Sequence, residues 1–486
     1  FNGNLNSLIM KELLSIGVNY IIIRHAVLLL SFVKTILIAY FLGPENLGIY
    51  ALIILIVEYL NYINLGVFDS MNRDVALYLR EIKNRDRIKD TISNALGFSA
   101  LSIIVLFIFF SAYSILLPDT IFQIDLSKYL PVIFCLVLIY QLKQFIVRYL
   151  RLYEKYVLLG LLEFLTQLIN LVCVILFVEE YQIDAVLYSI LGSNIFLVFF
   201  GFLYTKNISI RFSLRRIYRL IITGSPILLY AIFLFLFLSI DRAMIGFFYS
   251  DIKAMGAYQL ALSLASGLFT IFKAASFLFQ PKLIRYLNED INPQDSGLSS
   301  VKTQTFYLEM ILVILSSIGI ILTPIAIGNF LSEFSLSIIL TQFLIIAFAI
   351  YSISFLAMTY LSSNHLEMKT ILPLVFALIL SIVLNYTLVY LGYGLYGIAF
   401  SKILTFGIYG IFIFRLYLNN LGEPWMKNIV IIFGRLMIFM SLLCFLIYEK
   451  YQLYNILILF GVFYSFSLVR ISKIAFPLIS SYLKRS

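Results

Sequence analysis

The sequence has 486 residues, of which 62% are hydrophobic and only 12% are charged, and its mean hydropathy is +1.00. A water-soluble domain is about half apolar and a quarter charged, so most of these side chains must face lipid, which excludes a soluble globular protein. With 3 cysteines far apart and 2 histidines, the sequence offers no cysteine or histidine metal site, and no nucleotide-binding or hydrolase motif occurs. We therefore expect neither a metal nor a cofactor nor a catalytic residue.

Apolar runs separated by charged and turn-forming residues predict about fourteen membrane-spanning helices. Each run has about 17–25 residues, or slightly more if the helix is tilted, which is what a hydrocarbon core about 30 Å thick requires. The predicted spans are 16–42, 47–66, 94–117, 130–149, 157–178, 185–204, 221–248, 255–279, 306–327, 338–361, 370–391, 394–414, 429–448 and 453–471. The predicted fold class is therefore an all-α polytopic membrane protein.

The distribution of lysine and arginine predicts the orientation of these spans. If the N-terminus is cytoplasmic, the inner segments hold 26 of the 35 basic residues, the outer loops hold 3 and the spans hold 6. Because cytoplasmic loops are rich in lysine and arginine, both termini are predicted to be cytoplasmic. This bias also explains the net charge of +10 without a nucleic-acid partner.

The lengths of the loops bear on enzymatic activity. The two long loops, 67–93 and 280–305, are both on the predicted inner side, and no outer loop exceeds about fifteen residues. A polysaccharide polymerase or ligase usually carries its catalytic groups on a large outer loop. The sequence therefore predicts that the protein is not an enzyme.

An internal repeat relates the two halves of the chain. Segment 42–50 aligns with segment 250–258, so that Gly48 falls on Gly256, Tyr50 on Tyr258 and, at the same offset, Lys34 on Arg242. Six spans return the chain to its starting side, so the two repeats would be parallel, and transporters commonly place their substrate path between such halves. The predicted domains are a six-helix lobe at 1–204, a cytoplasmic linker at 205–220, a second six-helix lobe at 221–414 and two further helices with a cytoplasmic tail at 415–486.

Four motifs follow one another along the chain: GPENLGIY at 43–50, GSP at 224–226, DR at 241–242 with GAY at 256–258, and GLYGIA at 394–399. Together they resemble bacterial O-antigen or capsule repeat-unit flippases of the multidrug/oligosaccharidyl-lipid/polysaccharide exporter superfamily, over essentially the whole chain. The resemblance implies two lobes in a V around a central cavity that opens to one face at a time. It also implies a polyprenyl-pyrophosphate-linked oligosaccharide as cargo, moved to the outer leaflet of the bacterial cytoplasmic membrane by a monomer that works with a polysaccharide polymerase.

Charged side chains inside the spans are the candidate cargo-binding residues, because each costs about 2.5–3.5 kcal/mol to insert near the bilayer centre. Basic residues outnumber acidic ones there by 6 to 3, which favours an anionic cargo such as a pyrophosphate. The candidate substrate-binding residues are Arg24, Lys34, Arg242, Lys273 and Lys402. The candidate charge-balancing or ion-coupling residues are Glu58, Glu163 and Asp241.

Helical spacing predicts polar stripes on three spans, and such stripes must face protein or water rather than lipid. Because Asp241 and Arg242 are adjacent, they cannot face each other on a helix, and each needs a partner elsewhere. The stripes comprise Gly17, Arg24, Ser31 and Thr35 with Lys34 at one edge; Glu163, Gln167 and Asn170; and Lys402, Thr405 and Tyr409.

Alternatives remain open for both the charges and the cargo. Arg24 and Arg242 could extend their side chains to the inner surface, and any of these residues could instead join helices by an ion pair or hydrogen bond. A multidrug or cation antiporter of the same superfamily, or a peptidoglycan lipid-precursor flippase, would share the same spans. The sequence does not choose between proton coupling, sodium coupling and the membrane potential as the driving force.

Overall fold

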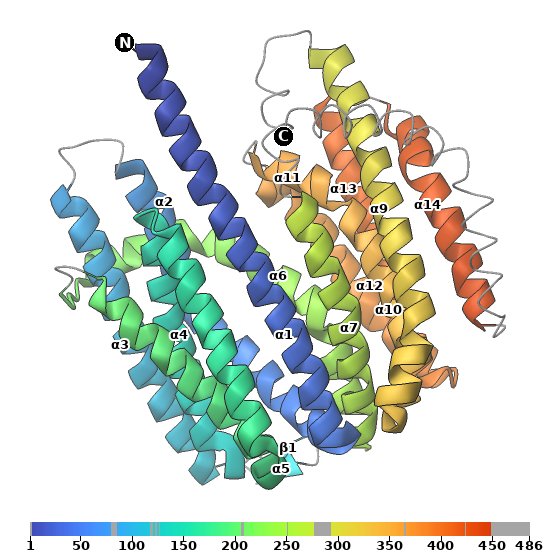
Figure 1. Ribbon diagram of the computed structural model, residues 1–486, viewed down its shortest axis with the longest axis horizontal. Coiled ribbons are helices and arrows are strands. Elements are labelled where there is room, and N and C mark those ends of the chain that lie inside the picture. Colours follow the sequence, from blue (N-terminus) through green and yellow to red (C-terminus); the bar gives the residue numbers. More distant parts are fainter. Residues whose placement is uncertain are drawn as a thin grey trace. The chain divides into compact units, whose positions relative to one another are not determined.

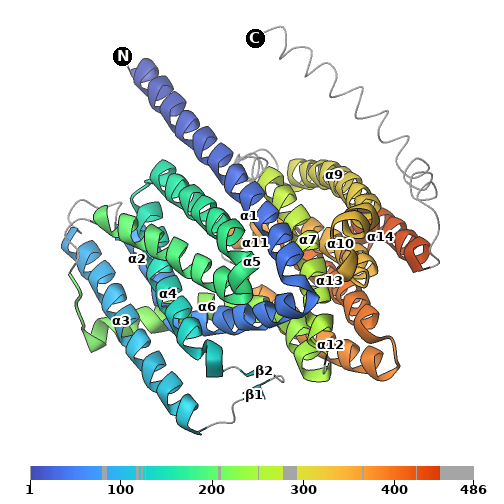
Figure 2. The same ribbon diagram turned by 60° about the horizontal axis from the view of Figure 1, so that its bottom comes forward.

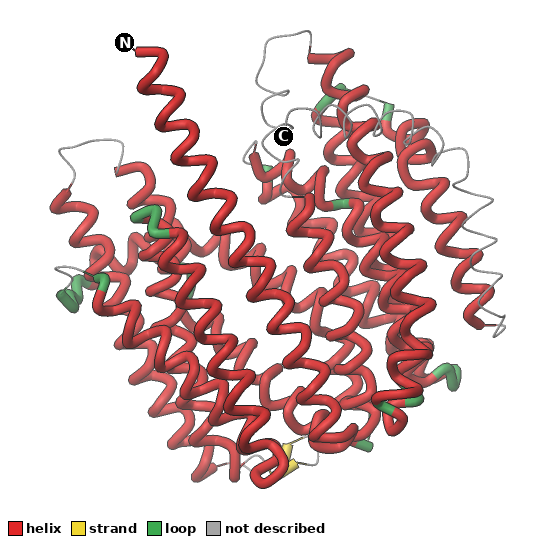
Figure 3. The backbone as a smooth tube through the Cα atoms, in the orientation of Figure 1, coloured by secondary structure: helices red, strands yellow, loops and turns green. Residues whose placement is uncertain are grey.

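The computed structural model describes residues 2–78, 85–116, 120–121, 124–125, 127–205, 209–249, 251–276, 293–363, 366–422 and 424–448. These residues are almost entirely helical (Figure 3). The exception is a short antiparallel pair, β1 (Thr120–Ile121) and β2 (Ile124–Asp125), in which Thr120 pairs with Asp125. The predicted all-α polytopic fold class is confirmed.

The chain divides into two compact units, Phe1–Ser263 and Leu264–Ser486, and α7 crosses the boundary between them. The helices of the first unit are α1 (Asn2–Leu60), α2 (Val67–Tyr78), α3 (Arg85–Leu116), α4 (Leu130–Leu152), α5 (Tyr156–Leu203), α6 (Leu214–Phe248) and the start of α7 (Ile252–Ser276). Those of the second unit are the end of α7, α9 (Pro293–Phe330), α10 (Ser337–Ile353), α11 (Phe355–Ser363), α12 (Ile371–Tyr390), α13 (Gly394–Asn420) and α14 (Trp425–Tyr448). The predicted division into lobes around a linker at 205–220 stays a prediction.

Within the described residues, eight helices are long and apolar enough to cross a membrane. Two of them, α1 and α5, each carry two predicted spans, because each contains a residue with non-helical backbone angles: Gly43 (φ 66°) in α1 and Gln182 (φ 48°) in α5. Gly43 precedes Pro44, which disfavours continuation of a regular helix. The bend of α1 is visible in Figure 2. The predicted span 453–471 lies outside the described residues.

The first unit is built on the packing of α5 against α1 and α4, and α2 packs against α3, α4 and α6 (Figure 1). The linker before α6 is held on α3, where a Cβ atom at Gly97 would overlap the carbonyl oxygen of Arg211. After the end of α1, the segment Asn61–Asn64 forms a 3₁₀ turn, and Gly66 then packs against Gly224 of the GSP motif. The close approach of these two backbones requires glycine at both positions.

In the second unit, α13 packs against α10, α12 and α14, and α10 also packs against α9. The predicted short turn between the eleventh and twelfth spans is confirmed, since α12 ends at Tyr390 and α13 begins at Gly394. Residues 293–305 of the predicted long loop at 280–305 form the start of α9, and residues 280–292 lie outside the described residues. The predicted loop at 67–93 contains α2 and the start of α3.

The two glycines that the internal repeat aligns, Gly48 and Gly256, are in contact in the first unit. A Cβ atom at Gly256 would overlap the carbonyl oxygen of Pro44, and one at Gly48 would overlap the carbonyl oxygen of Ile252. Each glycine thus packs on the other's turn, which is the kind of reciprocal contact that a two-fold relation produces. The absence of a side chain is what allows α1 and α7 to approach so closely here.

We expect Gly256→Ala to lower the thermal stability of the purified protein substantially, because the overlapping atom belongs to the backbone and cannot move aside. Overpacking of this kind costs about 1–3 kcal/mol. The matched control is Gly192→Ala, since nothing lies within 4 Å of a Cβ at Gly192. Thermal unfolding in detergent should show a lower midpoint for the first variant and an unchanged or higher midpoint for the second. Equal midpoints for the two variants would contradict the close packing.

Candidate functional site: a cationic cluster in the first unit

The packing of α1 on α5 brings two predicted polar stripes together. Arg24 Nη1 forms an ion pair with Glu163 Oε2 at 2.6 Å, and Lys34 Nζ donates a hydrogen bond to Gln167 Oε1 at 3.1 Å. One turn further along α5, Asn170 donates to Ser193 of the same helix, across its bend. The polar faces of the first and fifth spans therefore face each other rather than lipid.

Lys143 is a third cation at this place, and the sequence analysis missed it. The count of basic residues placed it in an inner segment at 143–156, but α4 continues to Leu152 and Lys143 lies within a membrane-spanning stretch. Its Nζ donates a hydrogen bond to Asn194 Oδ1 at 2.7 Å. It interacts electrostatically with Glu163 and Arg24, and it repels Lys34. The predicted span 130–149 already contained residue 143, so helix length was the signal that could have identified it.

We call Arg24, Lys34, Lys143 and Glu163 the cationic cluster. Its one carboxylate is paired with Arg24, whereas the hydrogen-bond partners of both lysines are uncharged amide oxygens. Two positive charges therefore stay uncompensated by these contacts, in a region where each charge is expensive to hold. The Arg24 side chain is 41% exposed, so the surrounding protein does not cover it completely. The chemistry that these residues offer is attraction of an anion by charge and by N–H donors, without bond cleavage.

A second polar group links α1, α6 and α7. Arg242 Nη2 forms an ion pair with Glu58 Oε2 at 3.1 Å, and Tyr258 donates a hydrogen bond to Asp241. Asp241 and Arg242 thus each have a partner elsewhere, as their adjacency predicts. Arg242 and Asp241 are buried, and Tyr258 is completely buried.

Glu58 also lines a cavity of about 360 Å³ between α1, α4 and α6. The Glu58 side chain is 39% exposed, whereas that of Arg242 behind it is 10% exposed. The same cavity contains Asp69 and Arg148, which form an ion pair at 2.8 Å. This cavity therefore presents two carboxylates and one guanidinium, and Arg242 contacts Glu58 rather than an open space.

The two remaining candidate residues, Lys273 and Lys402, belong to the second unit. Lys402 is buried in the second unit, with its ammonium 5.9 Å from the ring centre of Phe348 and 5.5 Å from that of Phe406. Lys273 lies in α7, where its side chain is outside the described part of the structure. Among the described side chains, no three His, Cys, Asp or Glu residues are grouped in a way that could hold a metal ion.

No family model matches the chain, and no curated protein matches it. Solved structures do match. The lipid II flippase MurJ in an inward closed conformation has a TM-score of 0.70 at 16% identity, covering 95% of this chain and 99% of that one.

Two transporters of the MATE type also match at lower TM-scores. ClbM in complex with Rb⁺ gives 0.56 at 15% identity over 85% of this chain and 96% of that one. A mutant of Vibrio cholerae VcmN gives 0.55 at 15% identity over 86% and 98%. These neighbours are transporters and flippases, and they belong to the superfamily indicated by the sequence motifs. The chain is thus an all-α polytopic membrane protein that shares its fold with these MATE transporters and with the MurJ flippase.

Proposed function

We propose that this protein is a flippase that moves a polyprenyl-pyrophosphate-linked oligosaccharide from the inner to the outer leaflet of the bacterial cytoplasmic membrane by alternating access. The observation that carries the proposal is the cationic cluster. Among the described side chains, its two lysines inside the membrane-spanning region have uncharged amide oxygens as their hydrogen-bond partners. A pyrophosphate supplies the negative charge that these lysines lack. The fold shared with a lipid II flippase supports the same class of cargo.

In this proposal, the cluster holds the headgroup while the polyprenyl tail stays in lipid. Arg24 offers a planar guanidinium that can donate two parallel hydrogen bonds to phosphate oxygens, and the two lysines add mobile point charges. Binding would draw Arg24 away from Glu163, and the released carboxylate would take Arg24 back when the cargo leaves. Glu163 thus serves as a built-in competitor that keeps the cargo from being held too tightly.

The driving force is also part of the proposal. An inside-negative potential favours outward movement of an anion by about 2.3 kcal/mol per charge per 100 mV. Glu58 and Asp241 are the carboxylates through which a proton or sodium ion would act, since both lie in membrane-spanning helices and contact Arg242. Glu58 forms an ion pair with the Arg242 side chain, and the Asp241 carboxylate accepts a hydrogen bond from the Arg242 backbone N–H.

The test is translocation in proteoliposomes. A fluorescent polyprenyl-pyrophosphate oligosaccharide is reconstituted with the protein, and the fraction that a membrane-impermeant reductant bleaches is followed with time. Transport by the protein, and none by empty vesicles, is the expected result. The same vesicles are loaded with a fluorescent organic cation, and efflux of that cation without glycolipid movement would establish a multidrug antiporter instead. In a deletion strain, the glycan that accumulates on the inner leaflet identifies the repeat unit.

A further inference from the structure

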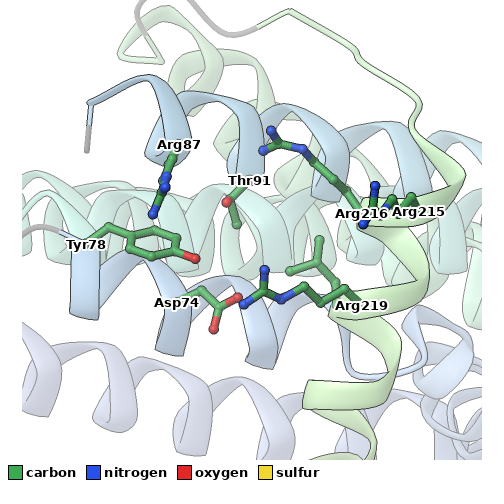
Figure 4. Close-up of a pocket in the computed structure, with 8 residues that line it drawn as sticks. Asp74, Tyr78, Arg87, Thr91, Arg215, Arg216 and Arg219 are labelled. Carbon is green, nitrogen blue, oxygen red and sulfur yellow. The ribbon is translucent and has the colours of Figure 1, made fainter. Parts of the chain in front are cut away.

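A second group of basic side chains lies in the first unit, outside the membrane-spanning clusters. The C-terminal end of α2, the start of α3 and the start of α6 enclose a cavity of about 430 Å³ (Figure 4). Four of its lining residues are arginines, namely Arg87, Arg215, Arg216 and Arg219, and Asp74 is the one acidic lining residue. We call this cavity the arginine pocket.

The arginine pocket has more arginines than carboxylates to neutralise them. Asp90 forms ion pairs with Arg216 and with the neighbouring Arg211. No ion pair involves Arg87, Arg215 or Arg219 among the described side chains. Figure 4 shows the Arg87 side chain above the Tyr78 ring and the Arg219 side chain beside that of Asp74. An anion that enters this space would therefore meet guanidinium groups from two helices.

The position of the α6 arginines along their helix is unfavourable without an anion. Arg215 and Arg216 are in the first turn of α6, which contains no acidic residue, whereas Arg87 shares the first turn of α3 with Asp86. The N-terminus of a helix carries a partial positive charge, so cations there are repelled and anions are attracted. A bound phosphate would reverse both effects, because it pairs with the arginines and with free N–H groups of the first turn.

The shape of the arginine pocket is fixed by the protein backbone. The segment before α6 is docked on α3, where Arg211 N donates to Ser93 O at 3.3 Å and Ser213 N donates to the Asn94 side chain at 2.8 Å. Asn94 is completely buried, and Gly97 leaves room for the backbone of Arg211. The backbone that carries the arginines of α6 is thus held in place before any ligand arrives, which lowers the cost of binding.

Exposed apolar side chains surround the same arginines. Four apolar or aromatic side chains here are each more than half exposed: Ile210, Phe212, Leu214 and Tyr218. They are interspersed in the sequence with four arginines, Arg211, Arg215, Arg216 and Arg219. A segment that combines exposed apolar and aromatic side chains with arginines is typical of a membrane interface, where the apolar groups enter the lipid and the cations meet the headgroups. This surrounding favours a lipid over a small soluble anion as the ligand.

We propose that the arginine pocket is a binding site for the phosphate of an acidic phospholipid headgroup, with phosphatidylglycerol as the simplest example. The cation count predicts that this side of the unit is cytoplasmic, so the lipid would come from the inner leaflet. The lipid would anchor the linker before α6 to the membrane surface. This site is distinct from the cationic cluster, and it does not depend on the identity of the cargo.

The experiment compares lipid binding by four forms of the full-length protein in nanodiscs of phosphatidylcholine with added phosphatidylglycerol. The pocket variant is Arg215→Gln/Arg219→Gln. The matched control is Arg73→Gln/Arg151→Gln, which removes the same charge from exposed positions of the same unit that do not line the pocket. Lys143→Met tests independence from the cationic cluster. Bound phosphatidylglycerol is measured by native mass spectrometry after release from the nanodisc.

We expect the wild-type protein, the control and Lys143→Met to retain phosphatidylglycerol in preference to phosphatidylcholine. In the pocket variant, the ratio of retained phosphatidylglycerol to phosphatidylcholine should fall at least about tenfold. Equal retention by the pocket variant would overturn the proposal. Displacement of the bound phosphatidylglycerol from the wild-type protein by micromolar inorganic pyrophosphate would assign the pocket to a soluble phosphate and overturn the lipid assignment. If the glutamine variant does not fold, Arg215→Lys/Arg219→Lys replaces it. We expect that variant to bind the lipid more weakly than wild type, because lysine keeps the charge but loses bidentate hydrogen bonding.

Discussion

Lys143→Met is expected to weaken binding of a pyrophosphate-linked glycolipid about a hundredfold and to slow its translocation in parallel. A unit charge about 6 Å from a bound anion contributes about 3 kcal/mol at an effective dielectric constant of about 20, which corresponds to that factor. Methionine keeps the length of the side chain and removes its charge. Binding is measured with the fluorescent glycolipid in detergent, and transport in proteoliposomes.

The stability of the same variant separates a functional role from a structural one. Removal of the Lys143 charge relieves its repulsion of Lys34 and Arg24. It also removes the attraction to Glu163 and the hydrogen bond to Asn194, so we expect the thermal midpoint to change little. The matched control is Lys128→Met, because Lys128 is exposed just before the same helix and should affect neither binding nor transport. A Lys143→Met protein that is destabilised but still binds the glycolipid normally would show that Lys143 only supports the fold.

Arg242→Met is expected to destabilise the first unit by about 1–3 kcal/mol. Removal of Arg242 leaves Glu58 without its cation, and the nearby buried Asp241 loses a neighbouring positive charge. Breaking a fully buried pair costs about 3–5 kcal/mol, but Glu58 is 39% exposed and water partly screens it, which lowers the expected value. The measurement is the thermal midpoint in detergent.

The double variant Arg242→Met/Glu58→Gln tests whether the loss comes from the unpaired carboxylate. Glutamine cannot carry the charge, so the double variant should recover a large part of the lost stability. Arg151→Met provides the control, since Arg151 is exposed at the end of α4. Additive effects of the two substitutions would mean that Arg242 and Glu58 do not interact in the folded protein.

The sequence predicted the fold class because its main determinant is local. An apolar run of sufficient length has few stable conformations in lipid other than a helix, so hydropathy alone identifies the spans. The same reasoning identified the helix-breaking turn at Gly43 and Pro44 and the short turn before Gly394, where the chain reverses. Helical periodicity also identified the polar stripes that contain Arg24 and Glu163, since the spacing of residues on a helix face is fixed by the helix itself.

Which residues pair with each other across helices could be identified only from the tertiary structure. The sequence showed that Arg24, Glu163, Glu58 and Arg242 each needed a partner, but not which residue met which, because those pairs are 139 and 184 residues apart. Lys143 was missed for a related reason: its role depends on where α4 ends and on the bend of α5 that brings Asn194 beside it. The arginine pocket likewise exists only because Asn94 and Gly97 hold a distant segment on α3. Composition and periodicity thus determined that this chain is a bundle of membrane-spanning helices with charges inside it. Long-range packing decided which charges form ion pairs and which two lysines donate to amide oxygens instead.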